Sequence, residues 1–167
     1  MKKRYFKRFI KAAFIILGLT FLINSCSSTK KAVALNESDV KNIIDSSQFT
    51  FVAERMTPLR GRNRILTSYY DVRVKHDTVS SFLPYFGRSF QAPLDPGKSP
   101  LEFNSYNFTY RVDQKKSGEW QVFINPKDRQ EVQQMMFTIF SNGTASLNVL
   151  STNGDPISFD GHIERNK

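Results

Sequence analysis

Two histidines, each beside an aspartate, have the side chains that metal chemistry would need. His76 lies in the segment KHDT next to Asp77, and His162 lies in DGHI close to Asp160. Imidazole nitrogens and carboxylate oxygens bind divalent metals such as zinc when the fold brings them to one point. Both segments are typical of turns, where such side chains are usually solvated. We therefore predict no metal site and no cofactor.

Other groups with catalytic potential are scarce. The sequence contains neither the Gly-x-Ser-x-Gly elbow of serine hydrolases nor a Walker phosphate-binding loop. The glutamates Glu102, Glu119 and Glu131 lie among polar neighbours, as ordinary exposed carboxylates do. We predict that the protein is not an enzyme. A weak metal-dependent hydrolase built on His76 and His162 is the least favoured hypothesis.

Cys26 is the only cysteine of the chain, and it follows closely on an apolar segment. The sequence LINSCSS resembles a bacterial lipobox, with Ile23 at the branched aliphatic position, Ser25 before the cleavage site and Cys26 as the lipidated residue. Asn24 departs from that pattern, because its position is more often small or apolar. A lone cysteine in an exported protein cannot form a disulfide within the chain, so lipidation explains Cys26 better than a buried thiol does.

The residues before Cys26 have the order of an export signal. Six basic residues lie within MKKRYFKRFIK, and residues 12–23 carry no charge. Twelve helical residues span about 18 Å, against about 30 Å of membrane hydrocarbon, which disfavours a transmembrane anchor. We predict a signal peptide over residues 1–25 and a lipid-anchored tether over residues 26–36.

The predicted anchor also indicates a location. Two or more acyl chains hold a protein stably on a bilayer, so membrane lipid would be a partner through acylated Cys26. Serine rather than aspartate follows the cysteine, which resembles the known signal for passage to the outer membrane, and no acidic cluster comes after it. We predict an outer-membrane lipid anchor with the domain on the periplasmic face.

The charge of the mature chain argues against a nucleic-acid partner. The signal segment holds six of the 24 basic residues, which leaves 18 against 15 acidic residues and a net charge of about +3. Nucleic-acid binding would need a basic face or a recognisable motif. The remaining basic cluster lies in a predicted solvated loop, ERMTPLRGRNR, and consists of Arg55, Arg60, Arg62 and Arg64. Contact of this loop with anionic lipid headgroups stays open.

Residues 37–167 are predicted to form a single β-rich domain. At its start, Val40, Ile43 and Ile44 have helical spacing behind Asn36 and Ser38, either of which suits a helix cap. From Phe49 onward the apolar period is two, the period of a strand. The predicted inward faces are Leu66, Tyr70, Val72 and Val74 in one strand, and Trp120, Val122 and Ile124 in another.

Two Asn-Gly pairs near the C-terminus mark hairpin turns. Pairing across Asn142 and Gly143 is predicted to place Phe140 opposite Ala145, Thr138 opposite Leu147 and Met136 opposite Val149. The second turn, TNGD, precedes a last strand. The predicted fold class is all-β, with roughly seven to nine mainly antiparallel strands in a barrel-like or sandwich meander after one short N-terminal helix.

The segment FLPYFGRSFQAP, residues 82–93, concentrates aromatic side chains around two turn-forming residues. Pro84 cannot donate to a strand ladder and Gly87 frees the backbone, so a strand should end or bulge near Tyr85. The preferred interpretation is a core plug at one end of the barrel, formed by Phe82, Phe86 and Phe90. The alternative is the lip of a cavity for an amphipathic anion, formed by Tyr85, Phe86 and Arg88.

Four segments in combination resemble a known family: LPYFGRSF, LEFNSYNFTY, FTIFSNGTASLNVLSTN and ISFDGHI. They are similar to the small lipoproteins of Bacteroidetes that carry domain of unknown function 4251, over about residues 49–163. The resemblance implies a lipid-anchored β-rich domain. It implies no activity and no catalytic residue, because the family has none assigned.

Three functions follow as hypotheses. The first is a lipid-tethered barrel that binds an apolar or amphipathic ligand, which a cavity lined by Phe and Tyr would favour. The second is a protein-interaction or envelope-structure module, which a filled core with an exposed apolar patch would favour. The third is the metal-dependent hydrolase, which needs both histidines to converge with acidic side chains.

Overall fold

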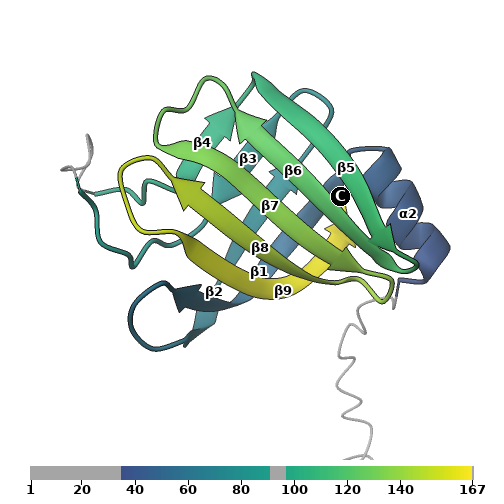
Figure 1. Cartoon of the computed structure of the whole chain (residues 1–167), viewed down its shortest axis with the longest axis horizontal. Helices are drawn as coiled ribbons and strands as arrows, with labels where there is room; N and C mark the ends of the chain where they lie inside the picture. The colour runs from purple at the N-terminus through teal and green to yellow at the C-terminus, as the bar shows by residue number, and fades with distance from the viewer. Residues whose placement is uncertain (1–34, 91–96, 167) are drawn as a thin grey trace, which may run out of the picture. The chain divides into compact units, whose positions relative to one another are not determined.

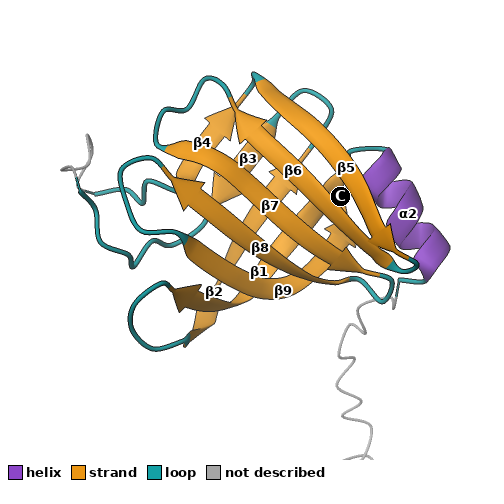
Figure 2. Cartoon of the chain, viewed as in Figure 1, coloured by secondary structure: helices purple, strands orange, loops and turns teal. Residues whose placement is uncertain are grey.

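The computed structural model describes residues 35–90 and 97–166. The predicted signal peptide and the lipidated Cys26 lie outside the described residues, as does the predicted tether up to residue 34. Within the described ranges the chain forms one helix followed by nine strands (Figures 1 and 2). Their bounds are α2 (Glu37–Asp45), β1 (Phe49–Pro58), β2 (Arg64–Val74), β3 (Val79–Phe82), β4 (Glu102–Ser105), β5 (Phe108–Lys116), β6 (Glu119–Pro126), β7 (Val132–Phe140), β8 (Thr144–Ser151) and β9 (Ile157–Arg165).

Helix α2 confirms the helix predicted behind Asn36. The Asn36 side-chain oxygen accepts a hydrogen bond from the backbone N–H of Asp39 at 2.8 Å, which caps the first turn. The predicted apolar stripe, Val40, Ile43 and Ile44, is buried. At the other end of the helix, the Tyr110 hydroxyl donates to the Ile44 carbonyl at 2.8 Å and ties α2 to β5. No helix in the described part of the chain is long and apolar enough to span a bilayer.

All strand pairs are antiparallel, in the order β4-β3-β2-β1-β9-β8-β7-β6-β5, and the curved sheet forms a nearly closed barrel (Figures 1 and 2). This confirms the predicted all-β class and decides for a barrel rather than a sandwich. Every neighbouring pair but one joins strands that are consecutive in sequence. The exception is β1 with β9, which pair from Phe49 with Arg165 to Pro58 with Ile157.

The two ends of the strand order, β4 and β5, leave a seam that is sealed by the β6–β7 loop. The Asp128 carboxylate accepts hydrogen bonds from the Ser105 hydroxyl and, at 2.8 Å, from the Tyr106 backbone N–H. Both bonds lower the pKa of the exposed Asp128 carboxyl, the Ser105 bond most. The Arg129 side chain donates to the Asn104 carbonyl at 2.6 Å. The exposed end of β4 is therefore covered by polar partners.

One apolar core fills the described barrel. The Phe137 ring receives Phe49 and Phe51 edge to face, with ring centroids 5.5 and 5.7 Å apart. The alternation predicted for the later strand is confirmed, since Trp120, Val122 and Ile124 are all buried. The largest fully buried side chains are Phe49, Phe51, Phe137, Phe159, Ile44, Met56, Leu83, Leu101, Ile124, Met135, Ile139 and Leu147.

The β7–β8 hairpin exists as predicted, but its predicted register is wrong by one residue. Ile139 pairs with Ala145, Phe137 with Leu147 and Met135 with Val149. The connection has three residues rather than two, because Gly143 adopts a left-handed φ of 84° and its N–H donates to the Phe140 carbonyl at 2.9 Å. One residue of slip moves every side chain to the other face, so Phe140 and Met136 lie outside the core.

The second Asn-Gly pair does not form a tight turn. Strand β8 ends at Ser151 and β9 begins at Ile157, so a longer loop joins them. Within it, Gly154 forms an isolated bridge with Ser89, and the Asn153 carbonyl accepts a hydrogen bond from the backbone N–H of Phe90 at 2.7 Å. This loop is therefore held by the aromatic segment that follows β3.

Candidate functional site

The predicted core plug is wrong, because its three rings face solvent. Phe82, Phe86 and Phe90 are 47%, 52% and 68% exposed. Strand β3 directs Val79 and Ser81 inward and Phe82 outward, as the two-residue period requires. The chain then turns, so that Leu83 takes the core position; its N–H donates to the carbonyl of Leu101, which is also fully buried.

The Tyr85 side chain connects the segment that follows β3 to the β8–β9 loop. Its hydroxyl lies 2.9 Å from the Arg88 carbonyl and 3.0 Å from the Asp155 carbonyl, and it can donate to one of them at a time. The backbone N–H of Asp155 also donates to the Arg88 carbonyl, at 3.0 Å. Burial raises the pKa of the Tyr85 phenol above its usual value. These contacts hold the two loops against each other.

Two glycines leave room for the Tyr85 side chain. A Cβ atom built on Gly87 would lie 2.5 Å from the Tyr85 hydroxyl oxygen, and one on Gly154 would lie 2.2 Å from it. Both positions therefore need glycine so that the phenol can pass between the two loops. The turn residues of the aromatic segment serve this closure.

Tyr85 and Phe86 also line a surface hollow with Tyr70 and Phe82, whose rings stack at 5.5 Å. Arg88 lies outside the set of residues that line this hollow. The cavity that the lip hypothesis placed behind these residues is occupied by buried side chains such as Leu83 and Leu101. A ligand contact at Tyr85, Phe86 and Arg88 stays a prediction, and in this fold it concerns the outer surface.

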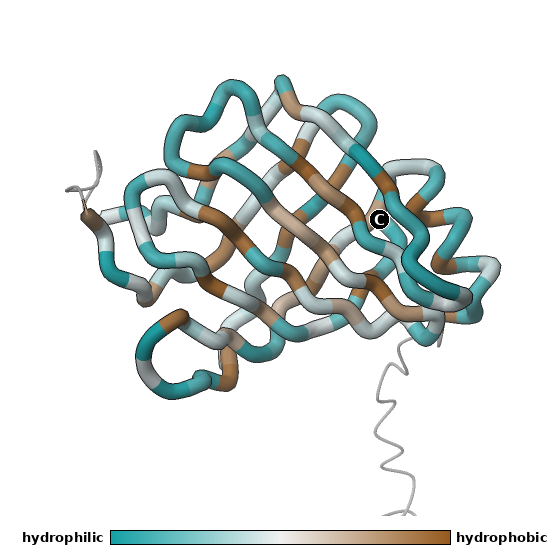
Figure 3. The backbone as a smooth tube through the Cα atoms, viewed as in Figure 1, coloured by the Kyte–Doolittle hydropathy of each residue, from teal (hydrophilic) through white to brown (hydrophobic). Residues whose placement is uncertain are grey.

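The β1–β2 loop lies beside the aromatic segment. The Arg64 guanidinium lies over the Phe86 ring, 4.6 Å from its centroid, which is cation–π geometry. Two apolar side chains at the base of this loop, Leu59 and Ile65, are 59% and 79% exposed. Figure 3 shows hydrophobic positions on either side of a hydrophilic turn in the β1–β2 loop. We call the following set the arginine–aromatic end: Leu59, Arg60, Arg62, Arg64, Ile65, Phe86 and Arg88.

The two segments of the arginine–aromatic end carry positive charge only, whereas Glu54, Asp160 and Glu102 line the hollows that Ile65 and Phe86 also line. Neither residues 57–66 nor residues 83–90 include an aspartate or a glutamate. None of its arginines forms an ion pair within the described ranges. The sequence had marked Arg60 and Arg62 as a solvated loop and Phe86 and Arg88 as a separate contact. The contact between the two segments, Arg64 over Phe86, depends on the pairing of β2 with β3 and has no local signal in the sequence.

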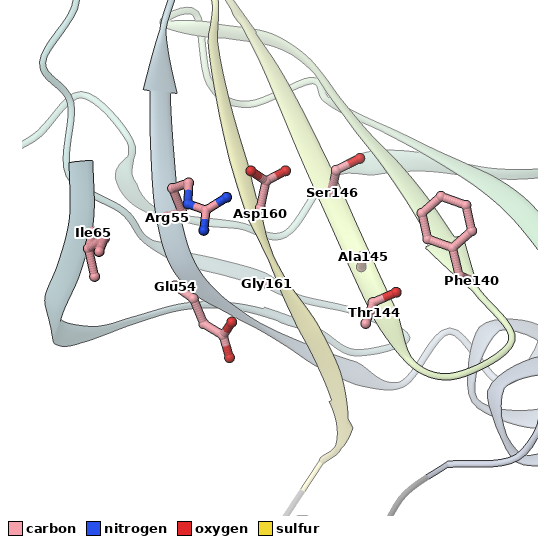
Figure 4. A pocket seen from close by; sticks show the side chains of 9 residues that line it. All are labelled: Glu54, Arg55, Ile65, Phe140, Thr144, Ala145, Ser146, Asp160 and Gly161. Carbon is pink, nitrogen blue, oxygen red and sulfur yellow. The ribbon is translucent and has the colours of Figure 1, made fainter. Parts of the chain in front are cut away.

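A second surface hollow lies on the outer wall of β1, β9 and β8 (Figure 4). It arises from a β-bulge between Ala53 and Arg55, which turns both Glu54 and Arg55 outward. Opposite the bulge, a Cβ atom on Gly161 would lie 1.9 Å from the Val52 carbonyl oxygen, so only glycine fits. The lining residues are Glu54, Arg55, Ile65, Phe140, Thr144, Ala145, Ser146, Asp160 and Gly161. Charges of both signs meet there.

The two histidines do not share partners. His162, on the outer face of β9, lies 2.9 Å from a Glu54 oxygen through Nδ1 and 3.4 Å from a Glu164 oxygen through Nε2. His76 and Asp77 lie in the turn between β2 and β3. Over residues 35–90 and 97–166, no group of three or more His, Cys, Asp or Glu side chains is arranged to hold a metal.

Comparisons with known proteins agree with this architecture. A family model described as a domain of unknown function, DUF4251, matches residues 31–163. A crystal structure of a DUF4251 family protein from Bacteroides eggerthii DSM 20697 superposes with a TM-score of 0.56 and 12% sequence identity, covering 77% of this chain and 87% of that one. At this identity the likeness concerns the fold alone. No curated protein matched the sequence.

Proposed function

Because the chain belongs to the DUF4251 family, whose domain has no known function, we propose a function from the surface of the barrel itself. The protein is a non-catalytic binding module, held on the cell envelope by lipid on Cys26. It contacts an amphipathic partner with its arginine–aromatic end. The predicted location is the periplasmic face of the outer membrane.

The single observation that carries this proposal is the combination, at one end of the barrel, of exposed apolar side chains and arginines that form no ion pair with any described residue. An amphipathic partner offers negative charge and apolar surface together, and this end can satisfy both. Stacking on Phe86 fixes the Arg64 guanidinium and joins the two segments into one surface.

The filled core supports a surface function over an internal one. Ligand-binding barrels leave a cavity, whereas here large side chains from β1, β6, β7, β8 and β9 occupy the described interior. The hypothesis of an apolar or amphipathic ligand therefore moves from inside the barrel to its end. A protein partner at the same end is the alternative, as in an interaction or envelope-structure module.

The side-chain contacts of His162 support the proposal of a non-catalytic protein. Both ring nitrogens face carboxylates, Glu54 and Glu164, on an open wall of the barrel. Catalytic histidines in hydrolases instead activate a hydroxyl, a thiol or a metal-bound water. The hydrolase hypothesis gains nothing from this arrangement.

Site-specific photo-crosslinking in intact cells tests the proposal. A benzophenone side chain replaces Arg62 at the arginine–aromatic end, and in a matched control it replaces Lys115, an exposed cation in β5. We expect adducts at position 62 and none at position 115. Adducts confined to position 115, or equal at both, would show that the barrel binds elsewhere. Mass spectrometry of the adduct tells lipid from protein.

A further inference from the structure

We infer that the partner of the arginine–aromatic end is the surface of an anionic bilayer. The arginines bind lipid phosphates, and the side chains of Leu59, Ile65 and Phe86 lie at the boundary of the acyl chains. This inference rests on the proposed function and names the partner of the same surface.

The shape of the arginine–aromatic end favours a bilayer over a small ligand. Leu59 and Ile65 flank a projecting loop, and most of their surface is exposed. Small ligands bind in concave sites that enclose most of their area, whereas interfacial segments present apolar side chains outward on a convex surface. The β1–β2 loop is of the second kind.

The arrangement of side chains matches the layers of a membrane interface. Arg60 and Arg62 occupy the turn between Leu59 and Ile65, so two apolar side chains flank a charged turn within one short segment. Arginine side chains bury their apolar stems and extend their charged heads, which suits a boundary between phosphate and hydrocarbon. Arg64 and Arg88 extend the charge to the neighbouring segment.

Charge complementarity commits the surface to anionic lipid. Each basic side chain near an anionic membrane contributes attraction that salt screens within about 10 Å. The two segments supply arginines and no acidic residue, and within the described ranges these arginines have no ion pairs to break before binding. A bilayer without net charge would not attract these arginines in this way.

A tether at the other end of the barrel permits this contact. Figure 1 shows α2, which begins at Glu37 near the start of the described chain, at the opposite end of the strands from the β1–β2 loop. Strand β1, with ten residues, is about 33 Å long, and the eight residues 27–34 reach up to about 28 Å. An anchored chain can therefore lie along the membrane with the arginine–aromatic end on the same surface.

Vesicle binding by the unlipidated protein tests the inference. The chain from residue 27 onward retains every described element and the whole core cluster, so it keeps the folded unit without the anchor. Flotation with vesicles of phosphatidylglycerol and phosphatidylethanolamine is compared with flotation on phosphatidylcholine. We expect binding to the anionic vesicles only, and release in about 0.5 M salt, because salt at that concentration screens charges beyond a few ångström.

Two double variants with the same change in charge identify the surface. Arg60→Ala with Arg62→Ala should weaken binding roughly 25-fold, at about fivefold for each arginine. The control, Lys75→Ala with Lys115→Ala, removes two exposed cations from the other end and should change binding by less than about threefold. Circular dichroism confirms that both variants fold.

Equal binding to both vesicle types, equal losses in both double variants, or no binding at all would each overturn the inference. The proposed function fails separately. If vesicles do not bind while position 62 forms a protein adduct in cells, only the bilayer is wrong. If position 62 also forms no adduct, the proposed function falls as well.

Discussion

The Tyr85 hydroxyl joins residues that lie 70 positions apart in the sequence. The sequence offered Tyr85, with Phe86 and Arg88, as a ligand contact, because aromatic rings with one fixed cation suit an amphipathic anion. The second partner of the Tyr85 hydroxyl, the Asp155 carbonyl, cannot be inferred from any local pattern. The ligand contact stays a prediction, while the hydrogen bonds of Tyr85 help to close the fold.

We predict that Tyr85→Phe lowers the free energy of unfolding by about 1 kcal/mol, because it removes one partly buried hydrogen bond and leaves the ring in place. Urea denaturation measures this loss. Tyr106→Phe is the matched control. Because Tyr106 is mostly exposed, this variant should lose less than about 0.5 kcal/mol of the free energy of unfolding. Equal losses in the two variants would mean that the Tyr85 hydroxyl does not hold the loops.

The exposure of Phe86 and Arg88 shows what the sequence could and could not tell about the site. An aromatic ring and a cation at these two positions predicted a contact surface, and that surface remains part of the proposed function. The Arg64 guanidinium over the Phe86 ring was missed, since 22 residues separate the two in the chain and no periodic pattern links them. Side chains at two strand ends become neighbours only through the sheet order.

Among the elements, the β7–β8 hairpin shows how a strong local signal was misapplied. Asn-Gly favours a two-residue turn, and that turn gave the wrong register. The apolar alternation already contained the answer. Phe137 and Leu147 must both face inward, and two residues separated by an even number of positions can lie directly opposite each other only if the loop has an odd number of residues. The hydrophobic pattern should therefore have taken precedence over the turn.

Gly143→Ala should lower the free energy of unfolding by about 1–2 kcal/mol, because a left-handed φ strains any residue with a Cβ. The new Cβ atom would also lie 3.2 Å from the Leu35 side chain, which must shift slightly. Gly143→Asn should lose less, since asparagine tolerates this conformation. Chemical denaturation compares the two. If alanine costs no more than asparagine, strain at this turn is not what fixes the three-residue loop.

At the scale of the whole molecule, the fold class could be predicted from the sequence, and the closure of the barrel could not. Two-residue periodicity predicts strands and their inner faces, as Trp120 and Val122 illustrate. The choice between barrel and sandwich depends on the pairing of β1 with β9, and no turn motif or residue spacing in the sequence indicates that pairing. The family match extends over residues 31–163 and carries no statement about activity.

The anchor is tested on the full chain. Cells that express the protein are fed an alkyne fatty acid, and we expect label on the wild type and none on Cys26→Ser, because the thiol is the acceptor. The variant should also keep its signal segment and migrate as the larger precursor. Label on Cys26→Ser, or no label on the wild type, would show that the protein is not anchored by lipid on Cys26.

The pairing of β1 with β9 also governs when the molecule can finish folding. Synthesis delivers β1 early and β9 last, and until β9 arrives the earlier strands form only hairpins and open meanders with their edges free. Closing a loop of this length is slow compared with forming neighbouring hairpins. For a chain exported unfolded, as the proposed function requires, this delay is an advantage. The barrel of such a chain cannot close before β9 has passed through the channel.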